Sequence, residues 1–233
     1  MPNDVYDQLI EQGEIAREKE NYSEALTALD KALIIAARDE QWTQLVNALA
    51  HKLLTYKHLF QKTGKDSFLE LMLGEAQTGL KISEDKKILG QPKAVMLLRI
   101  GDYHFLKEEF AKAMSFYEEA LENIEKEKKG EHAEYLSHLG LCQAELGKQE
   151  GLDNINQALQ LALADDQTRP FHKLVILSGI HMRQAVAYNK FKQFEQAKAS
   201  FEIAKTMAEE LALEHKMSMR LKQLEKVKQG LGL

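Results

Sequence analysis

The chain has 233 residues, a formal net charge of −5, 44% hydrophobic residues and 29% charged residues. These values are ordinary for a soluble protein, and the length is sufficient to bury a sizeable core. Only three prolines are present and β-branched runs are scarce, whereas Ala, Leu, Glu, Lys and Gln, which lose little side-chain entropy in a helix, dominate. The composition therefore predicts an all-α protein and argues against a sheet protein.

Charge is spread evenly, because Lys and Arg alternate with Asp and Glu along almost the whole chain. The sequence has no basic block that would follow a phosphate backbone, so nucleic acid is not an expected partner. The one basic bias lies near the C-terminus, at Lys216, Arg220, Lys222, Lys226 and Lys228. A solvated helix face near the negative end of a helix dipole accounts for this bias, and a docking or membrane-surface role is the alternative.

Sequence features that report on location favour the cytoplasm. The single cysteine, Cys142, cannot form an internal disulfide, which fits a reducing compartment. The N-terminal residues are acidic and lack the apolar segment of a secretory signal, and no run approaches the roughly 18 apolar residues of a membrane span. We therefore expect a cytoplasmic protein that does not associate with a membrane.

Apolar residues recur at helical spacing throughout, and they divide the chain into helix pairs. Five pairs are predicted over residues 3–38, 41–82, 91–127, 131–164 and 170–211, followed by a capping helix over residues 213–230. In the final segment Met217, Leu221, Leu224 and Val227 form one apolar stripe between polar residues. Such a helix is expected to cover the exposed apolar flank of a terminal repeat.

Breaks between the helices follow the usual cap signals. Gly64 is a candidate helix C-cap, while Pro92 and Pro170 suit helix starts because a first-turn residue needs no N–H donor. Connections are expected over residues 83–91, 126–130 and 165–169.

The clearest pair spans Leu97–Asn123, with a tight turn at Lys107–Glu109. Small residues recur at one place in the second helix of every pair, at Ala32, Gly79, Ala120, Ala158 and Ala204. Their intervals are 47, 41, 38 and 46 residues, a mean of 43. A sustained period of this size predicts a stacked array in which neighbouring hairpins bury each other's faces.

The residue pattern resembles the tetratricopeptide repeat, whose first helix carries W-x2-L-G-x2-Y and whose second carries A-x3-F. The third pair matches it at Leu97, Ile100, Gly101, His104, Ala113 and Tyr117, and the first, fourth and fifth pairs match at corresponding positions. In the second pair Leu53 occupies the small-residue position and only Gly79 aligns well. The fourth pair is one residue shorter at its turn, so Gly151 completes it in place of alanine.

The long period is similar to that of the repeats in kinesin light chains and bacterial Rap-type regulators. HEAT repeats are the alternative, because their period overlaps with this one. The resemblance implies a right-handed α-solenoid of about five antiparallel helix pairs, forming a single domain over residues 1–233.

Motifs of a catalytic, cofactor or metal site are absent from the sequence. His51 and His58 could share a helix face, but the chain lacks the H-E-x-x-H and Cys–His spacings of zinc sites, so packing or surface roles account for the histidines. Cys142 falls at a position that normally holds a small buried residue, without a nearby His or Asp to activate it. We expect no enzyme activity, no cofactor and no metal.

The resemblance implies a different kind of site, the concave groove lined by the first helix of each pair. The ligand-facing positions of the family fall on Ile10, Arg17, Asn47, Leu98, Asp102, Phe105, Leu141, Met182, Val186 and Asn189. The set is largely apolar or acidic, unlike the Lys, Arg and Asn of repeats that hold a C-terminal carboxylate. An amphipathic helix or an extended peptide suits such a groove better. The alternative is that these residues only pack neighbouring first helices together.

The sequence thus favours a non-catalytic scaffold or adaptor that binds a protein or peptide in its groove. A peptide-responsive regulatory sensor is one alternative. A structural subunit that self-associates through its C-terminal helix is another. A monomer or weak homodimer is expected.

Overall fold

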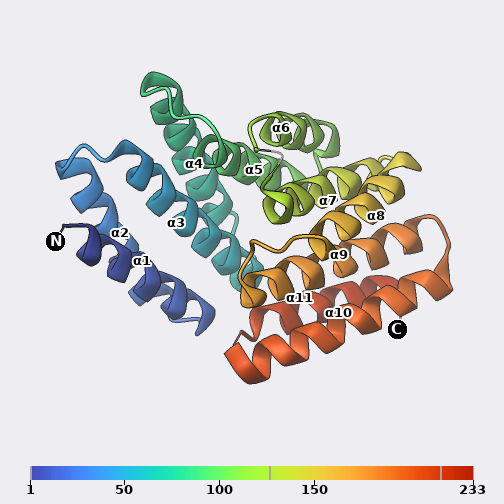
Figure 1. Cartoon of the computed structure of the whole chain (residues 1–233). Coiled ribbons are helices and arrows are strands. Elements are labelled where there is room, and N and C mark those ends of the chain that lie inside the picture. Colours follow the sequence, from blue (N-terminus) through green and yellow to red (C-terminus); the bar gives the residue numbers. More distant parts are fainter. Residues whose placement is uncertain (1, 126, 216, 233) are drawn as a thin grey trace. The chain divides into compact units, whose positions relative to one another are not determined.

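The computed structural model describes residues 2–125, 127–215 and 217–232, and within them it contains eleven α-helices and no strand (Figure 1). The helices are α1 Pro2–Glu18, α2 Tyr22–Arg38, α3 Trp42–Thr63, α4 Ser67–Asp85, α5 Gln91–Leu106, α6 Phe110–Glu122, α7 Lys129–Glu145, α8 Glu150–Leu163, α9 Pro170–Lys190, α10 Phe194–His215 and α11 Met219–Leu231. We call α1, α3, α5, α7 and α9 the first helices, and α2, α4, α6, α8 and α10 the second helices. The all-α prediction is confirmed.

The helices form two compact units, Met1–Lys107 and Glu108–Leu233. In the first unit each helix packs against the next one in sequence, and α3 also packs against both α1 and α5. The second unit repeats this scheme, with α9 packed against α7 and α11. First helices therefore form a row in each unit, which α11 continues in the second. The single domain expected over residues 1–233 stays a prediction.

Tight turns join most helices, and many contain one residue with a left-handed backbone. Gly64 after α3 has φ 67° and Gly147 after α7 has φ 75°, a conformation that glycine adopts without a Cβ clash. Glu20, Glu40, Lys87, Glu108 and Lys192 have φ between 53° and 60°, although this conformation costs a residue with a Cβ about 1–2 kcal/mol. The predicted Gly64 cap and the tight turn at Lys107–Glu109 are confirmed.

The small residues of the second helices are buried, as the repeat pattern predicts. Ala32, Ala120, Ala158 and Ala204 are each 0% exposed, and Gly79 is buried as well. A close backbone approach joins α7 to α8, where a Cβ placed on Gly140 would lie 2.6 Å from the carbonyl oxygen of Gly151. Gly151 therefore takes the close-packing role expected of it in the fourth pair.

Three predicted boundaries are wrong by a few residues. Helix α4 continues to Asp85 rather than ending near Ser83, whose buried Oγ donates to the Gly79 carbonyl oxygen at 2.9 Å. Helix α7 already begins at Lys129, inside the link expected over residues 126–130, and Lys126 lies outside the described residues. Helix α10 extends to His215 and α11 runs over Met219–Leu231, so the capping helix does not span residues 213–230. Polar stretches without Gly or Pro keep a high helix propensity, which is why α4 and α10 continue beyond their predicted ends.

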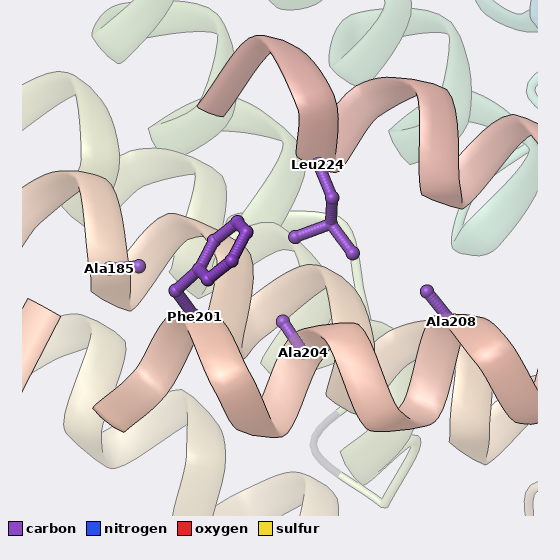
Figure 2. Close-up of a cluster of buried hydrophobic side chains, with 5 residues drawn as sticks. All are labelled: Ala185, Phe201, Ala204, Ala208 and Leu224. Carbon is purple, nitrogen blue, oxygen red and sulfur yellow. The ribbon is translucent and has the colours of Figure 1, made fainter. Parts of the chain in front are cut away.

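Helix α11 packs on α9 and α10 through a buried apolar group that we call the C-terminal cluster. Its members are Ala185, Phe201, Ala204, Ala208 and Leu224 (Figure 2). Half-buried side chains of Met182, Leu221, Val227 and Leu231 pack around it. The cluster joins the last helix to the rest of the second unit.

Candidate functional site

Buried polar side chains are concentrated on the first helices. In the part of the chain that the structure describes, twelve of the fifteen buried polar or charged residues lie on these helices. The twelve are Arg17, Thr55, His58, Arg99, Asp102, Ser137, His138, Gln143, Ser178, His181, Arg183 and Gln184. Because a buried polar group needs a hydrogen-bond partner, these residues must be organised by their neighbours.

In the first unit, polar contacts connect α1 to α3. The Tyr6 hydroxyl donates to the backbone carbonyl oxygen of Gln44 at 2.6 Å, and Asn47 Nδ2 lies 3.5 Å from the same hydroxyl. One turn further along, His51 Nδ1 lies 3.2 Å from Glu14 Oε1. The two helices are thus linked by several side chains, and one of them, Asn47, is predicted to line the groove.

A charged group connects α3 to α5 in the same unit. Lys57 Nζ lies 2.7 Å and Arg99 Nη1 lies 2.8 Å from Asp102 Oδ2, and the Asp102 side chain is only 3% exposed. A carboxylate at this depth requires such cations, because burial disfavours its charged form. The three residues form a fixed polar feature inside the row of first helices.

Helix α3 is also tied to both neighbouring second helices. Lys52 Nζ lies 2.9 Å from Asp30 on α2 and 2.9 Å from Glu75 on α4, and the Tyr56 hydroxyl donates to Glu75 at 3.0 Å. Burial, followed by the nearby Glu75 carboxylate, raises the pKa of Tyr56 to about 12. The Tyr56 phenol therefore remains a hydrogen-bond donor at neutral pH.

In the second unit, cations of α9 reach back to α7. The Arg183 guanidinium directly contacts His138 Nε2, and Lys190 Nζ lies 2.9 Å from Glu145 Oε2. Since a guanidinium only donates, Nε2 of His138 is the acceptor in this contact. Both pairs join residues 45 apart in sequence, close to the mean repeat period.

Gln184 lies at the centre of a polar network on the other side of α9. Its Nε2 donates to Asn156 Oδ1 at 2.7 Å, while its Oε1 accepts from Ser200 Oγ at 3.0 Å and lies 3.1 Å from His181 Nδ1. Burial lowers the pKa of His181, against the smaller opposing effect of Gln184. His181 is therefore held as a neutral donor.

An open hollow lies beside the α1–α2 turn, away from the predicted groove, and its lining includes Gln12, Glu20, Tyr22, Glu24 and Lys31. Among the described residues no three His, Cys, Asp or Glu side chains gather in a way that could hold a metal ion. Within the same residues no helix has the length and apolar character needed to cross a membrane.

Comparison with known proteins gives matches of structure. No protein-family model and no curated protein sequence matches the chain. The structure of BtubC (BKLC) from P. vanneervenii matches with a TM-score of 0.64 and 18% identity, covering 90% of this chain and 83% of that one. The TPR-like repeats of a Podosopora anserina kinesin light chain match with a TM-score of 0.57 and 12% identity, over 89% of this chain and 96% of that one. PilF of Pseudomonas aeruginosa matches with a TM-score of 0.54 and 15% identity, over 99% and 90% of the two chains.

The fold is that of TPR-like repeats. The predicted all-α solenoid of the kinesin-light-chain type is thereby confirmed at the level of fold.

The ten residues predicted to line the TPR groove all lie on first helices, and none is fully exposed. Ile10, Arg17, Leu98, Asp102 and Leu141 are buried, whereas Asn47, Phe105, Met182, Val186 and Asn189 are half-buried. The role of these residues in binding stays a prediction.

Some of these residues contact side chains of a neighbouring first helix or of α11. Asp102 meets Lys57, and Asn47 approaches Tyr6. Met182 packs against the C-terminal cluster, and Asn189 Nδ2 lies 3.4 Å from the Gly230 carbonyl oxygen on α11. Helix α11 thus contacts groove positions of α9.

Four polar residues that the sequence analysis did not select occupy one shared register position. His51, Arg99, His138 and Arg183 each lie two residues before the small-residue position of the first helix, which Leu53, Gly101, Gly140 and Ala185 occupy in four successive TPR-like pairs. A basic or imidazole side chain recurring at one register was the signal available in the sequence. It escaped attention because the resemblance directed the search to the neighbouring positions.

Proposed function

We propose that the protein is a non-catalytic scaffold or adaptor that binds a peptide or protein segment along its first helices. The observation that supports this most strongly is the concentration of buried polar side chains on these helices. Well-packed apolar residues would make the row at least as stable, because buried ion pairs add little net stability. The row nevertheless keeps Lys57, Arg99 and Asp102. Such residues are useful where a partner must be recognised by position and charge.

The partner that fits this surface is an extended peptide or an amphipathic helix. Half-buried apolar side chains, such as Phe105 and Val186, stand on the same helices as the polar groups. Alternation of apolar contact area and fixed polar groups is the pattern by which grooves read peptide side chains. A reducing compartment such as the cytoplasm suits the only cysteine, Cys142, which is buried in α7.

The test combines capture with a matched pair of double variants. Phe105→Ala with Asn47→Ala shortens two half-buried side chains of first helices in one unit. The partner is captured with the tagged wild-type chain from host extract, identified, and its binding segment is titrated as a synthetic peptide. We expect the double variant to bind that peptide at least tenfold more weakly, which corresponds to about 1.4 kcal/mol.

The control changes the same residue classes on second helices. Phe194 is 61% exposed on α10, and Gln157 is exposed on α8. Phe194→Ala with Gln157→Ala should leave the peptide affinity unchanged, while thermal unfolding confirms that both double variants fold. Loss of binding in the control but not in the first-helix variant would refute the proposal.

A further inference from the structure

We infer that the face of α9 and α10 covered by α11 is a binding surface for a basic amphipathic helix, with α11 as its resident occupant. This inference rests on the proposed function and assigns one class of partner to one part of the surface. It is carried by the shape, the charge and the polar contacts of the second unit.

The shape of this face suits a helix. Ala185, Ala204 and Ala208 are each 0% exposed and form a floor of small side chains, beside which Phe201 stands (Figure 2). Small residues allow two helix backbones to approach closely, and a large side chain can then fill the space between them. Leu224 of α11 occupies this space (Figure 2).

The polar contacts place α11 along the predicted groove stripe of α9. Arg220 Nη2 donates to the Val175 carbonyl oxygen at 3.1 Å, and Asn189 Nδ2 donates to the Gly230 carbonyl oxygen at 3.4 Å. Between these two contacts Met182 packs on the C-terminal cluster. The resident helix therefore covers two residues, Met182 and Asn189, that the sequence assigns to ligand contact.

The two helices that meet here carry opposite net charge. Helix α10 carries five carboxylates against two lysines, namely Glu195, Glu202, Glu209, Glu210 and Glu214 against Lys198 and Lys205. Helix α11 carries four basic residues against one acid, namely Arg220, Lys222, Lys226 and Lys228 against Glu225. Opposite potentials favour association and suppress partners of the wrong sign. The net charge of α10 thus favours a basic helix on this face over an acidic one.

Few side chains hold the resident helix in place. Only Met219 and Leu224 are buried among the thirteen residues of α11. On α10, by contrast, six residues are buried, namely Ala197, Ser200, Phe201, Ala204, Ala208 and Leu211. The receiving surface is therefore fixed by its own packing, while α11 is held by two buried and a few half-buried side chains and can exchange with a helix of the same chemistry.

The experiment uses the full chain and a fluorescent peptide with the sequence of α11, residues 219–231. Leu224→Ala in the chain weakens the resident helix, so the peptide should bind this variant at least tenfold more tightly than the wild type by fluorescence anisotropy. Gln229→Ala, at an exposed position of α11, should bind the peptide as the wild type does. A peptide carrying its own Leu224→Ala change should not bind either chain.

A further peptide variant tests whether the surface requires a basic partner. A peptide in which the four basic residues are replaced by Glu should bind the Leu224→Ala chain at least tenfold more weakly, and equal binding would overturn the basic partner. Hydrogen exchange of α9 and α10 shows whether the receiving surface stays folded in the Leu224→Ala chain. If it does not, Val227→Ala, at a half-buried position, supplies a milder variant.

Absence of peptide binding to both the Leu224→Ala and the Val227→Ala chains would overturn the inference. Concentration-dependent dimerisation of the wild type through α11 would also do so, because the occupant would then be a second copy.

The outcome is separable from that of the proposed function. The capture test uses changes on α3 and α5, whereas this test uses a defined peptide and changes on α11. Partner binding that depends on Phe105 and Asn47, together with no exchange of α11, would reject only the present inference.

Discussion

First and second helices share one fold but bury different kinds of side chain. Helix α7 buries twelve of its 17 residues, including Ser137, His138 and Gln143, whereas α8 buries five of its 14 residues and all five are apolar or glycine. A first helix has neighbours on several sides, since α7 packs against α6, α8 and α9. Second helices keep one apolar face inward and one polar face in water. Packing alone thus explains the second helices, but it does not explain the polar interior of the first.

Histidines follow the same division. Seven of the eight histidines in the sequence lie on first helices, namely His51, His58, His104, His132, His138, His172 and His181. Imidazole is the side chain that titrates nearest to neutral pH. The first helices therefore carry both the buried ion pairs and most of the imidazole side chains of the chain.

The strongest test of this contrast removes the carboxylate between α3 and α5. Asp102→Ala leaves Lys57 and Arg99, whose side chains are only 14% and 10% exposed, without the carboxylate to which both bind. Breaking one side of a buried ion pair costs about 3–5 kcal/mol. We expect a loss of this size in the free energy of unfolding, measured by urea denaturation with circular dichroism.

An ion pair next to a second helix provides the control. Lys112 lies 3.1 Å from Glu109 at the start of α6, and both side chains are largely exposed. Exposed pairs contribute little, because water and salt screen them. Lys112→Ala should leave the unfolding curve unchanged. Equal losses in the two variants would contradict the distinction between the two kinds of helix.

The next largest effect concerns the contact at which a first helix touches its second helix. Gly140→Ala places a Cβ 2.6 Å from the Gly151 carbonyl oxygen, and a backbone atom cannot move aside as a flexible side chain can. Overpacking of this kind costs about 1–3 kcal/mol. Gly74→Ala on α4 meets nothing within 4 Å, so it should instead stabilise by up to about 1 kcal/mol through helix propensity. Thermal unfolding of both variants measures the difference, and the same sign for both would refute the close-contact argument.

The sequence predicted the second helices better than the first. Their small residues recur with a mean interval of 43 residues because each must fit against a neighbouring backbone, and that constraint is visible in a single chain. Helix ends were less predictable where Glu84 and Asp85 continue α4, since charged residues are compatible with a helix until Gly or Pro ends it.

The candidate site was predictable only in part. Periodicity placed Asp102 on a ligand-facing position, but it did not show that Lys57 and Arg99 bind its carboxylate, because that contact depends on how two helices of different repeats meet. The approach of Arg183 to His138 escaped prediction for the same reason. A sequence reveals which face a residue occupies more readily than which partner it finds across the interface.

A smaller effect should separate two turns that follow first helices in the second unit. After α9, Lys192 has φ 60°, whereas Gly147 takes this conformation after α7. Lys192→Gly relieves the left-handed strain at some cost in chain entropy, so we expect a net gain of about 1 kcal/mol or less in the free energy of unfolding. Gly147→Ala should produce a loss of similar size. Denaturant midpoints measure both changes, and a loss with Lys192→Gly would show that its side chain stabilises the turn by other means.

The smallest expected effect is a change in the pH dependence of stability through His181. Burial lowers its pKa below the ordinary value of 6.5, so the unfolded chain binds a proton more readily than the folded chain. Neutral His181 therefore contributes fully to the free energy of unfolding above pH 6.5, and this contribution is lost as the pH falls through the pKa of His181 in the folded chain. His181→Asn keeps an N–H donor toward Gln184 but removes the titrating group. The free energy of unfolding should therefore fall less steeply between pH 7 and pH 5, and denaturation at several pH values measures this slope.

Burial also lowers the pKa of His132 on α7, and His132→Asn should likewise make the free energy of unfolding depend less steeply on pH. If neither change alters the slope, the pH sensitivity does not reside in these buried imidazoles of the first helices.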